Sequence, residues 1–193
     1  MKILSIDPGL INLSYIYLDP SSYNNQSLNP SSSNDTPNII KWQTISVTNK
    51  NYKKMKFEEL TEELLLTLNE NFNDEFDADI VLIENQPSLK NMNMKSISVV
   101  IYTYFNMMRL LYGNIKEVKF ISATNKLKCK KGKNLKIDTY KDRKKSSIEL
   151  AKLYVTDLFP NWIEFFNNQK KIDDYSDCLN QAIYYMEFVL KIL

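Results

Sequence analysis

The hydrophobic pattern of the chain begins with short runs that predict β-strands. Residues 2–6 form an apolar run that ends in an Asp-Pro-Gly turn sequence. Residues 12–18 and 39–47 are rich in β-forming side chains and predict a second and a third strand. Because only a turn separates the first two runs, we expect a hairpin, which the third strand extends into an antiparallel meander.

Helical periodicity then alternates with further strand patterns. Apolar residues spaced three or four apart predict helices at residues 54–72, 95–112, 141–157 and 174–193. The continuous apolar run at 78–84 predicts a central strand covered on both faces, and 117–122 predicts a fifth strand. This order predicts an α/β fold: a five-stranded mixed sheet, its first three strands an antiparallel meander, flanked by helices.

The length of the chain favours one hydrophobic core. A chain of 193 residues is long enough to bury one core well and short for two, and no internal repeat or change of composition divides it. We therefore expect a single domain over residues 1–193. Residues 19–38 are mostly Ser, Asn and Pro, and they predict a flexible insertion in that domain.

Composition excludes several kinds of chemistry. The chain has no histidine, so a Ser-His-Asp triad, histidine-ligated zinc and a histidine general base are all ruled out. Its two cysteines cannot build a disulfide framework. No apolar run reaches the roughly 18–20 residues that span a bilayer, and the first residues are typical of a strand rather than a leader. We therefore expect an intracellular protein that is not associated with a membrane.

Charge is unevenly spread, although the net charge is only +2. Residues 116–145 hold twelve Lys or Arg and three acids, whereas residues 58–79 hold nine acids and no base. A basic surface suits a polyanion, because lysines that neutralise phosphates release counterions. A solvated lysine-rich loop is the alternative explanation of the same segment.

Four carboxylates lie where such a sheet can bring them together. Asp7 ends the first strand, Glu84 ends the fourth, and Asp174 and Asp177 share a face near the start of the last helix. If the first and fourth strands are neighbours, their ends lie about 5 Å apart. Four clustered carboxylates repel one another unless a cation neutralises them, and oxygen ligands select hard ions such as Mg²⁺ or Mn²⁺. Each acid alone also fits a turn or a helix N-terminus, so the prediction depends on their conjunction.

Three sequence blocks carry a resemblance to a known family. Ser-Ile-Asp-Pro-Gly-Leu at 5–10, Ile-Glu-Asn-Gln at 83–86 and Lys-Lys-Ile-Asp-Asp-Tyr-Ser-Asp-Cys-Leu at 170–179 occur in this order. Together they resemble the RuvC-like Holliday junction resolvases, most of all the branch of poxviruses and other large DNA viruses, with the yeast mitochondrial resolvases next. The resemblance implies an RNase H-like fold and a homodimer that cuts four-way DNA junctions symmetrically, leaving 5′ phosphates. For a viral protein, it also places the activity in the host cytoplasm or the virion.

The resemblance also implies roles for individual residues. It makes Asp7, Glu84, Asp174 and Asp177 ligands of two Mg²⁺ ions, which Mn²⁺ can replace, and Lys126 a catalytic lysine, with Lys144 or Lys145 as a candidate for a second. The lysine-rich segment and the helix that follows it are expected to contact DNA through Lys128, Lys130, Lys131, Lys133, Lys136, Arg143, Lys144 and Lys145. The apolar helix at 95–112 is expected to form part of the dimer contact, with ordinary core packing as the alternative.

Other functions stay open from the sequence alone. A nuclease acting on flaps, other branched DNA or RNA–DNA hybrids would use the same carboxylates. A non-catalytic junction-binding module would need the acids only as caps, although acids beside a phosphate disfavour binding. An actin-like or sugar-kinase fold also carries an Asp-x-Gly turn, but it needs more glycines than the three present.

Overall fold

The computed structural model describes residues 1–9, 11–20, 37–73, 75–87, 92–133 and 135–193. Most of the insertion predicted at 19–38 lies outside these residues, so its flexibility stays a prediction. The predicted extent of the single domain likewise stays a prediction.

Five strands form one mixed sheet. They are β1 (Ile3–Asp7), β2 (Asn12–Asp19), β3 (Asn38–Ser46), β4 (Ala78–Asn85) and β5 (Ile115–Ser122), in the order β3-β2-β1-β4-β5. The first three strands pair antiparallel, whereas β4 runs parallel to both β1 and β5. The predicted meander is confirmed, and the condition set for the acids to meet, that the first and fourth strands are neighbours, holds.

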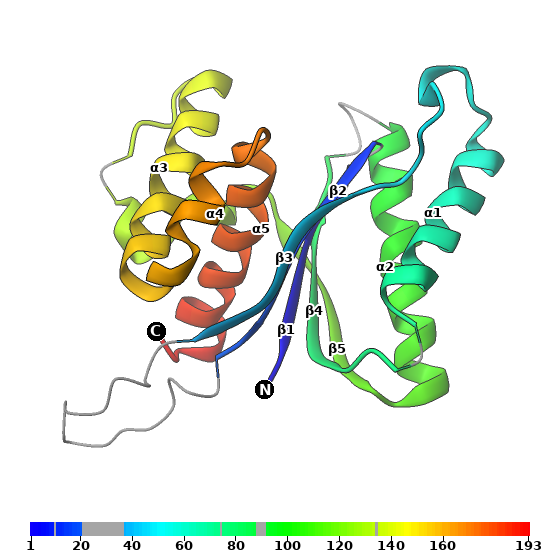
Figure 1. The fold of residues 1–193 in the computed structure, drawn as a ribbon, viewed down its shortest axis with the longest axis horizontal. Helices are drawn as coiled ribbons and strands as arrows, with labels where there is room; N and C mark the ends of the chain where they lie inside the picture. Colours follow the sequence, from blue (N-terminus) through cyan, green and yellow to red (C-terminus); the bar gives the residue numbers. More distant parts are fainter. Residues whose placement is uncertain (10, 21–36, 74, 88–91, 134) are drawn as a thin grey trace.

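Helices cover both faces of this sheet (Figure 1). One layer contains α1 (Phe57–Asn71) and α2 (Met92–Tyr112), and the other contains α3 (Tyr140–Leu158), α4 (Ile163–Asn167) and α5 (Ile172–Tyr185). Short 3₁₀ turns lie at η2 (Tyr52–Lys54), η3 (Asn125–Leu127), η4 (Lys130–Gly132) and η5 (Pro160–Trp162). The five strands and the four long helices thus follow the predicted order, while α4 and the short turns were not predicted.

Successive residues of the central strands point to opposite layers. Ile3 and Leu82 pack in the cluster beneath α3 and α5, whereas Leu4 and Val81 pack in the cluster beneath α1 and α2. All four side chains are fully buried. This explains why these strands appear in the sequence as continuous apolar runs, because both faces exclude water.

The prediction of one helix from residue 174 to 193 is wrong at its C-terminal end. The α-helix ends at Tyr185 and continues as a π-helical turn, η6 (Met186–Leu190), after which Lys191 adopts a left-handed conformation with φ of 55°. Buried Glu187 accepts hydrogen bonds from the Lys130 backbone N–H and the Tyr154 hydroxyl. Apolar spacing is nearly the same in α- and π-helices over one turn, so the sequence pattern does not separate them.

Among the described residues, no helix combines the length and the apolar character that crossing a bilayer requires.

Candidate metal centre and nucleic-acid interface

Asp7 and Glu84 lie side by side because β1 and β4 are parallel and in register. Ile6 pairs with Ile83, so the next residue of each strand is one of the two acids. The turn after Asp7 is tight: a Cβ on Gly9 would overlap the carbonyl oxygen of Asn12. A larger residue at this position would therefore shift the turn that carries Asp7.

Helix α5 is fixed against the tip of β1 by buried hydrogen bonds. The Ser5 hydroxyl donates to the Cys178 carbonyl oxygen at 2.8 Å. Gln181 donates from Nε2 to Ser5 Oγ at 3.0 Å and to the Ile6 carbonyl oxygen at 3.2 Å. These contacts place Asp177, one turn before Gln181, beside the strand ends. The sequence analysis did not identify Gln181, because its burial is visible only in the folded structure.

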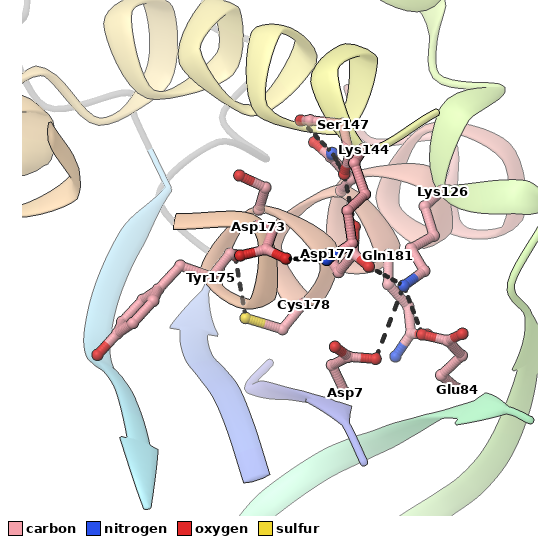
Figure 2. Close-up of polar contacts among 12 residues, drawn as sticks. Asp7, Glu84, Lys126, Lys144, Ser147, Asp173, Tyr175, Asp177, Cys178 and Gln181 are labelled. Atoms are coloured by element: carbon pink, nitrogen blue, oxygen red, sulfur yellow. Dashed lines mark hydrogen bonds and ion pairs between the residues drawn. The ribbon is translucent and has the colours of Figure 1, made fainter. Parts of the chain in front are cut away.

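The carboxylates of Asp7, Glu84 and Asp177 converge at this point (Figure 2). One oxygen from each lies within 4.8 Å of the others. The Lys126 ammonium sits among them, with Nζ 2.5 Å from Asp177 Oδ2 and 3.6 Å from Asp7 Oδ1. Lys126 also forms an ion pair with Glu84 Oε2, and each of these two side chains is only 8% exposed. We call Asp7, Glu84, Asp177 and Lys126 the acid cluster.

Burial and mutual charge set the protonation of the acid cluster. Burial raises the pKa of Asp7 well above its ordinary value, because Lys126 opposes the rise only in part and the charge of Glu84 adds to it. Burial also acts to raise the pKa of Glu84, but a hydrogen bond from Asp7 and the charge of Lys126 outweigh it, so the pKa of Glu84 is lowered. Burial acts to lower the pKa of Lys126, yet the three carboxylates raise it well above its ordinary value. Lys126 therefore stays cationic among these acids.

Asp174 lies near the acid cluster without joining its oxygen group. Among the described residues, the group within 4.8 Å consists of Asp7, Glu84 and Asp177. Asp174 lines the same cavity, and its pKa is raised by burial and by the neighbouring charge of Asp173. Asp173 instead pairs with Lys144 at 2.5 Å. The structure thus brings three of the four predicted acids together and leaves the fourth at the cavity wall.

The acid cluster opens into a cavity of about 860 Å³. Five acidic and three basic side chains are among those that line it, namely Asp7, Glu84, Asp173, Asp174, Asp177, Lys128, Arg143 and Lys144. Tyr140 also lines the cavity and is 69% exposed. A cavity lined by both acidic and basic side chains suits a phosphate diester. The acids can bind metal cations that contact the phosphate, and the basic side chains attract it directly.

The eight predicted DNA-contacting residues are all exposed, but they do not all face the cavity. Lys128, Arg143 and Lys144 line it. Lys131 instead forms an ion pair with Asp157 at 2.6 Å. Lys116, which opens the basic stretch of the sequence, pairs with Asp79 at the start of β4, at the opposite end of this strand from Glu84. The basic stretch of the sequence is therefore divided among different parts of the surface.

The sequence analysis missed two polar residues beside the acid cluster: Ser147, which contacts Asp177, and Asn180, which contacts Ser147. The Ser147 hydroxyl donates to Asp177 Oδ1 at 2.5 Å. Asn180 in turn donates from Nδ2 to Ser147 Oγ at 3.0 Å. Ser147 lies on α3, so its contact depends on how α3 packs against α5, which local sequence patterns do not reveal.

The acid cluster has the donor set of a site for a hard divalent cation. Its ligating atoms are carboxylate oxygens from three elements, and they already surround a positive charge. The residues therefore fit Mg²⁺ or Mn²⁺. Because the same oxygens bind Lys126, a divalent cation must share or replace these ion pairs.

Comparison with known proteins gives one family match over almost the whole chain. The model of the family described as Poxvirus A22 protein matches residues 1–191. A search of curated proteins matches an uncharacterized protein of Acanthamoeba polyphaga mimivirus, 33% identical over 125 residues. That match covers 57% of this chain, and the chain spans only 29% of the length of this relative.

Solved structures with the same fold cover nearly the whole chain. The fowlpox virus resolvase in complex with Holliday junction DNA has a TM-score of 0.61 at 22% identity, covering 98% of this chain and 99% of that one. The yeast mitochondrial Holliday junction resolvase has a TM-score of 0.61 at 17% identity, covering 98% and 81%. Thermus thermophilus RuvC has a TM-score of 0.57 at 9% identity, covering 97% and 96%. The predicted RNase H-like fold of the RuvC type is confirmed.

Proposed function

The chain belongs to the Poxvirus A22 protein family, and from this premise we propose that it is a Holliday junction resolvase. In this proposal it is a metal-dependent endonuclease that cuts four-way DNA junctions symmetrically, leaving 5′ phosphates. The observation that carries the proposal is the meeting of carboxylate oxygens from β1, β4 and α5 within 4.8 Å, beneath a cavity with basic residues in its wall. Support also comes from the shared fold of a fowlpox virus resolvase whose structure holds junction DNA.

We propose that Asp7, Glu84 and Asp177, joined by Asp174, hold two Mg²⁺ ions, for which Mn²⁺ can substitute. Bound divalent cations would activate the attacking water and neutralise charge on the phosphate. The chain contributes the rigid placement of the ligands, because two of them continue hydrogen-bonded strands and the third lies on a helix fixed to β1. No histidine is needed for this chemistry.

Lys126 supplies a positive charge beside the phosphate in this proposal. Its ammonium is held within reach of all three carboxylates, and its raised pKa keeps it charged at neutral pH. As negative charge builds on the phosphate, a cation at this position offsets it. Lys144, paired with Asp173 at the cavity wall, is the second lysine near the site.

The DNA arms are proposed to lie over the cavity and the exposed basic residues beside it. Lys128, Arg143 and Lys144 contact the phosphates nearest the cut, whereas Lys130, Lys131, Lys133, Lys136 and Lys145 contact the backbone farther along. Phosphate contacts of this kind position a duplex without selecting its sequence. Junction choice then depends on shape and symmetry.

A homodimer would present two such sites to the two opposed strands of a junction. Helix α2 carries exposed apolar residues, of which Val99, Met107, Leu110 and Leu111 lie toward one face and Tyr112 is its last residue. We propose that this face contacts the second copy. Sedimentation of the wild-type chain as a dimer, and of Leu110→Asp as a monomer, is expected; a monomeric wild type at micromolar concentration contradicts the dimer.

Cleavage of a substrate panel tests the proposed function. Labelled four-way junctions, flaps, RNA–DNA hybrids and linear duplexes are incubated with the protein and Mg²⁺. We expect paired, symmetric cuts in the four-way junction that disappear with EDTA and in the Asp7→Asn, Glu84→Gln and Asp177→Asn variants, while junction binding persists. Glu70→Gln, which alters an exposed acid of α1, is the matched control and should cut normally.

Two results would contradict the proposal. Preferred cleavage of flaps or hybrids would make the chain a nuclease of another substrate class. Junction binding without cleavage in Mg²⁺ or Mn²⁺ would make it a binding module.

The family name also leads us to propose that a viral protein of this kind acts in the host cytoplasm or the virion.

A further inference from the structure

Both carboxylate oxygens of Asp177 have a fixed partner. Oδ2 accepts from Lys126 Nζ at 2.5 Å, and Oδ1 accepts from the Ser147 hydroxyl at 2.5 Å. Figure 2 shows Ser147 approaching Asp177 from α3, on the side away from Asp7 and Glu84. Lys126 thus neutralises the charge of the Asp177 carboxylate, and Ser147 orients it.

The direction of the Ser147 hydrogen bond is determined by Asn180. Asn180 Nδ2 donates to the Ser147 carbonyl oxygen at 2.9 Å and to Ser147 Oγ at 3.0 Å. Because a carbonyl oxygen only accepts, the amide nitrogen of Asn180 must face Ser147. Ser147 Oγ therefore accepts from Asn180, and its single hydroxyl proton is left to donate to Asp177.

This arrangement is unfavourable for a purely structural contact. Asn180 is fully buried where α3 packs on α5, and Ser147 is 4% exposed. Among the described residues, Asn180 Oδ1 is one of four buried side-chain atoms without a hydrogen-bond partner. A buried amide with one unpaired oxygen lowers stability relative to an apolar side chain of similar size, so its presence beside a charged cluster calls for another role.

We propose that Ser147 and Asn180 are positioning residues that set the Asp177 carboxylate for a divalent cation. Ser147 holds Oδ1, so that Oδ2 faces the oxygens of Asp7 and Glu84, and Asn180 fixes the rotation of the Ser147 hydroxyl. This inference rests on the proposed metal-dependent function, because it assigns a ligand of that site its orientation.

Metal affinity measured without DNA gives the most direct test. Mn²⁺ is titrated calorimetrically into the wild type, Ser147→Ala, Asn180→Leu, the double variant and Ser147→Thr. Ser98→Ala is the matched control, because Ser98 is also fully buried and donates one hydrogen bond, to the Lys95 carbonyl oxygen on α2. Melting temperatures of all chains, and junction affinity without metal, are measured in parallel.

We expect Ser147→Ala to weaken Mn²⁺ binding about 10-fold or more, as loss of a hydrogen bond to a metal ligand usually does. Asn180→Leu should weaken it less while melting at or above the wild-type temperature, and the double variant should be no worse than Ser147→Ala, because both act through one hydroxyl. Ser147→Thr should restore affinity, Ser98→Ala should leave it unchanged, and junction affinity should persist throughout. Cleavage by Ser147→Ala should recover as the Mn²⁺ concentration is raised.

Wild-type Mn²⁺ affinity in a folded Ser147→Ala chain would overturn the inference, as would losses that add in the double variant. Should Ser147→Ala fail to fold, Asn180→Leu decides alone: unchanged Mn²⁺ affinity then overturns the inference. Absence of Mn²⁺ binding by the wild type would overturn it too. Mn²⁺ binding by the wild type without cleavage of any junction would instead overturn the proposed function and leave the positioning role standing.

Discussion

Lys126 forms ion pairs with three acids that two strand ends and one helix bring together. Its side chain is as buried as that of Glu84, and its ammonium lies within 4 Å of each acid of the cluster. Ion pairs in such surroundings do not add stability relative to an apolar core, yet removal of one partner leaves the other charges buried and unpaired. The effect of Lys126 on folding stability can therefore be measured separately from catalysis.

Replacement of Lys126 by Met should destabilise the metal-free protein. Loss of the ammonium leaves the carboxylates of Glu84 and Asp177 without a cation, and breaking a buried pair in this way costs about 3–5 kcal/mol. Urea unfolding in EDTA measures the change. Added Mg²⁺ should stabilise the variant more than the wild type, because the ion supplies the missing charge.

Lys145→Met, at an exposed position of α3, is the control and should change stability little. Equal stability of Lys126→Met and the wild type in EDTA would show that Lys126 does not neutralise the acids in solution.

The positions of the site residues were predictable where those residues lie at the ends of strands. Asp7 and Glu84 terminate apolar runs in the sequence, and parallel pairing of those runs brings the two acids side by side. Asp174 was grouped with Asp177 because both fit one helical face, but the structure leaves it outside the oxygen group. Ser147 and Asn180 were not predictable, because their contacts arise from the packing of α3 on α5. The roles of all these residues as ligands or catalysts remain predictions.

At the scale of elements, the sheet was easier to predict than the end of the last helix. Continuous apolar runs mark buried central strands, and both central strands are found where the runs predict them. The change from α5 to the π turn η6 coincides with Glu187, a buried acid that bonds the Lys130 backbone N–H at 2.7 Å and the Tyr154 hydroxyl at 2.5 Å. These partners come from η4 and α3, so only the folded structure reveals the reason for the change.

Glu187→Leu should therefore release the η4 turn. It removes two hydrogen bonds to a carboxylate and leaves the partly buried Lys130 backbone N–H without its partner, which costs about 1–3 kcal/mol. Amide hydrogen exchange should show faster exchange at Lys130, and urea unfolding should show the loss of stability. Tyr154→Phe removes the hydroxyl that bonds Glu187 and the Lys131 backbone N–H but leaves the bond between Glu187 and the Lys130 N–H, so it should speed exchange at Lys130 less. Full protection of the Lys130 amide in Glu187→Leu would contradict the role.

Ion pairs at the end of the sheet away from the acid cluster should make the stability of the fold sensitive to acid. A hydrogen bond from Lys116 lowers the pKa of Asp79 below the ordinary 3.8, although burial opposes it, and a hydrogen bond from Lys2 likewise lowers the pKa of Asp77. A carboxyl whose folded pKa is lowered adds stability above its unfolded pKa, and this is lost as pH falls through the folded value.

The free energy of unfolding should consequently decline as pH falls below about 4, because Asp77 and Asp79 become protonated there. Asp79→Asn should flatten that decline while lowering stability at pH 7. Urea unfolding between pH 2.5 and 7 measures both effects, and a variant whose acid decline matches the wild type would exclude Asp79 as a contributor.

At the scale of the whole molecule, charge is arranged by the fold rather than by the sequence. Lys116 lies at the end of the sheet away from the acid cluster, whereas Lys128 and Arg143 line the cavity despite the intervening residues. Counting charges along the chain predicted a basic surface, but it did not show which residues face the cavity. That selection follows from the turns η3 and η4 and from the start of α3.

The salt dependence of junction binding should report this arrangement. Each phosphate contact contributes about 0.9 to the slope of log affinity against log salt. We expect Lys128→Gln and Arg143→Gln each to reduce the magnitude of the slope by about 1. Lys116→Gln should leave the slope unchanged, and an equal reduction by all three variants would mean that the cavity rim has no special part in binding.

Anomalous diffraction from crystals grown with Mn²⁺ tests the central claim most directly. The account predicts a strong peak within coordination distance of oxygens from Asp7, Glu84 and Asp177, with the Lys126 ammonium moved from its present ion pairs. A map in which Mn²⁺ binds elsewhere, while Lys126 keeps all three ion pairs, would contradict the account.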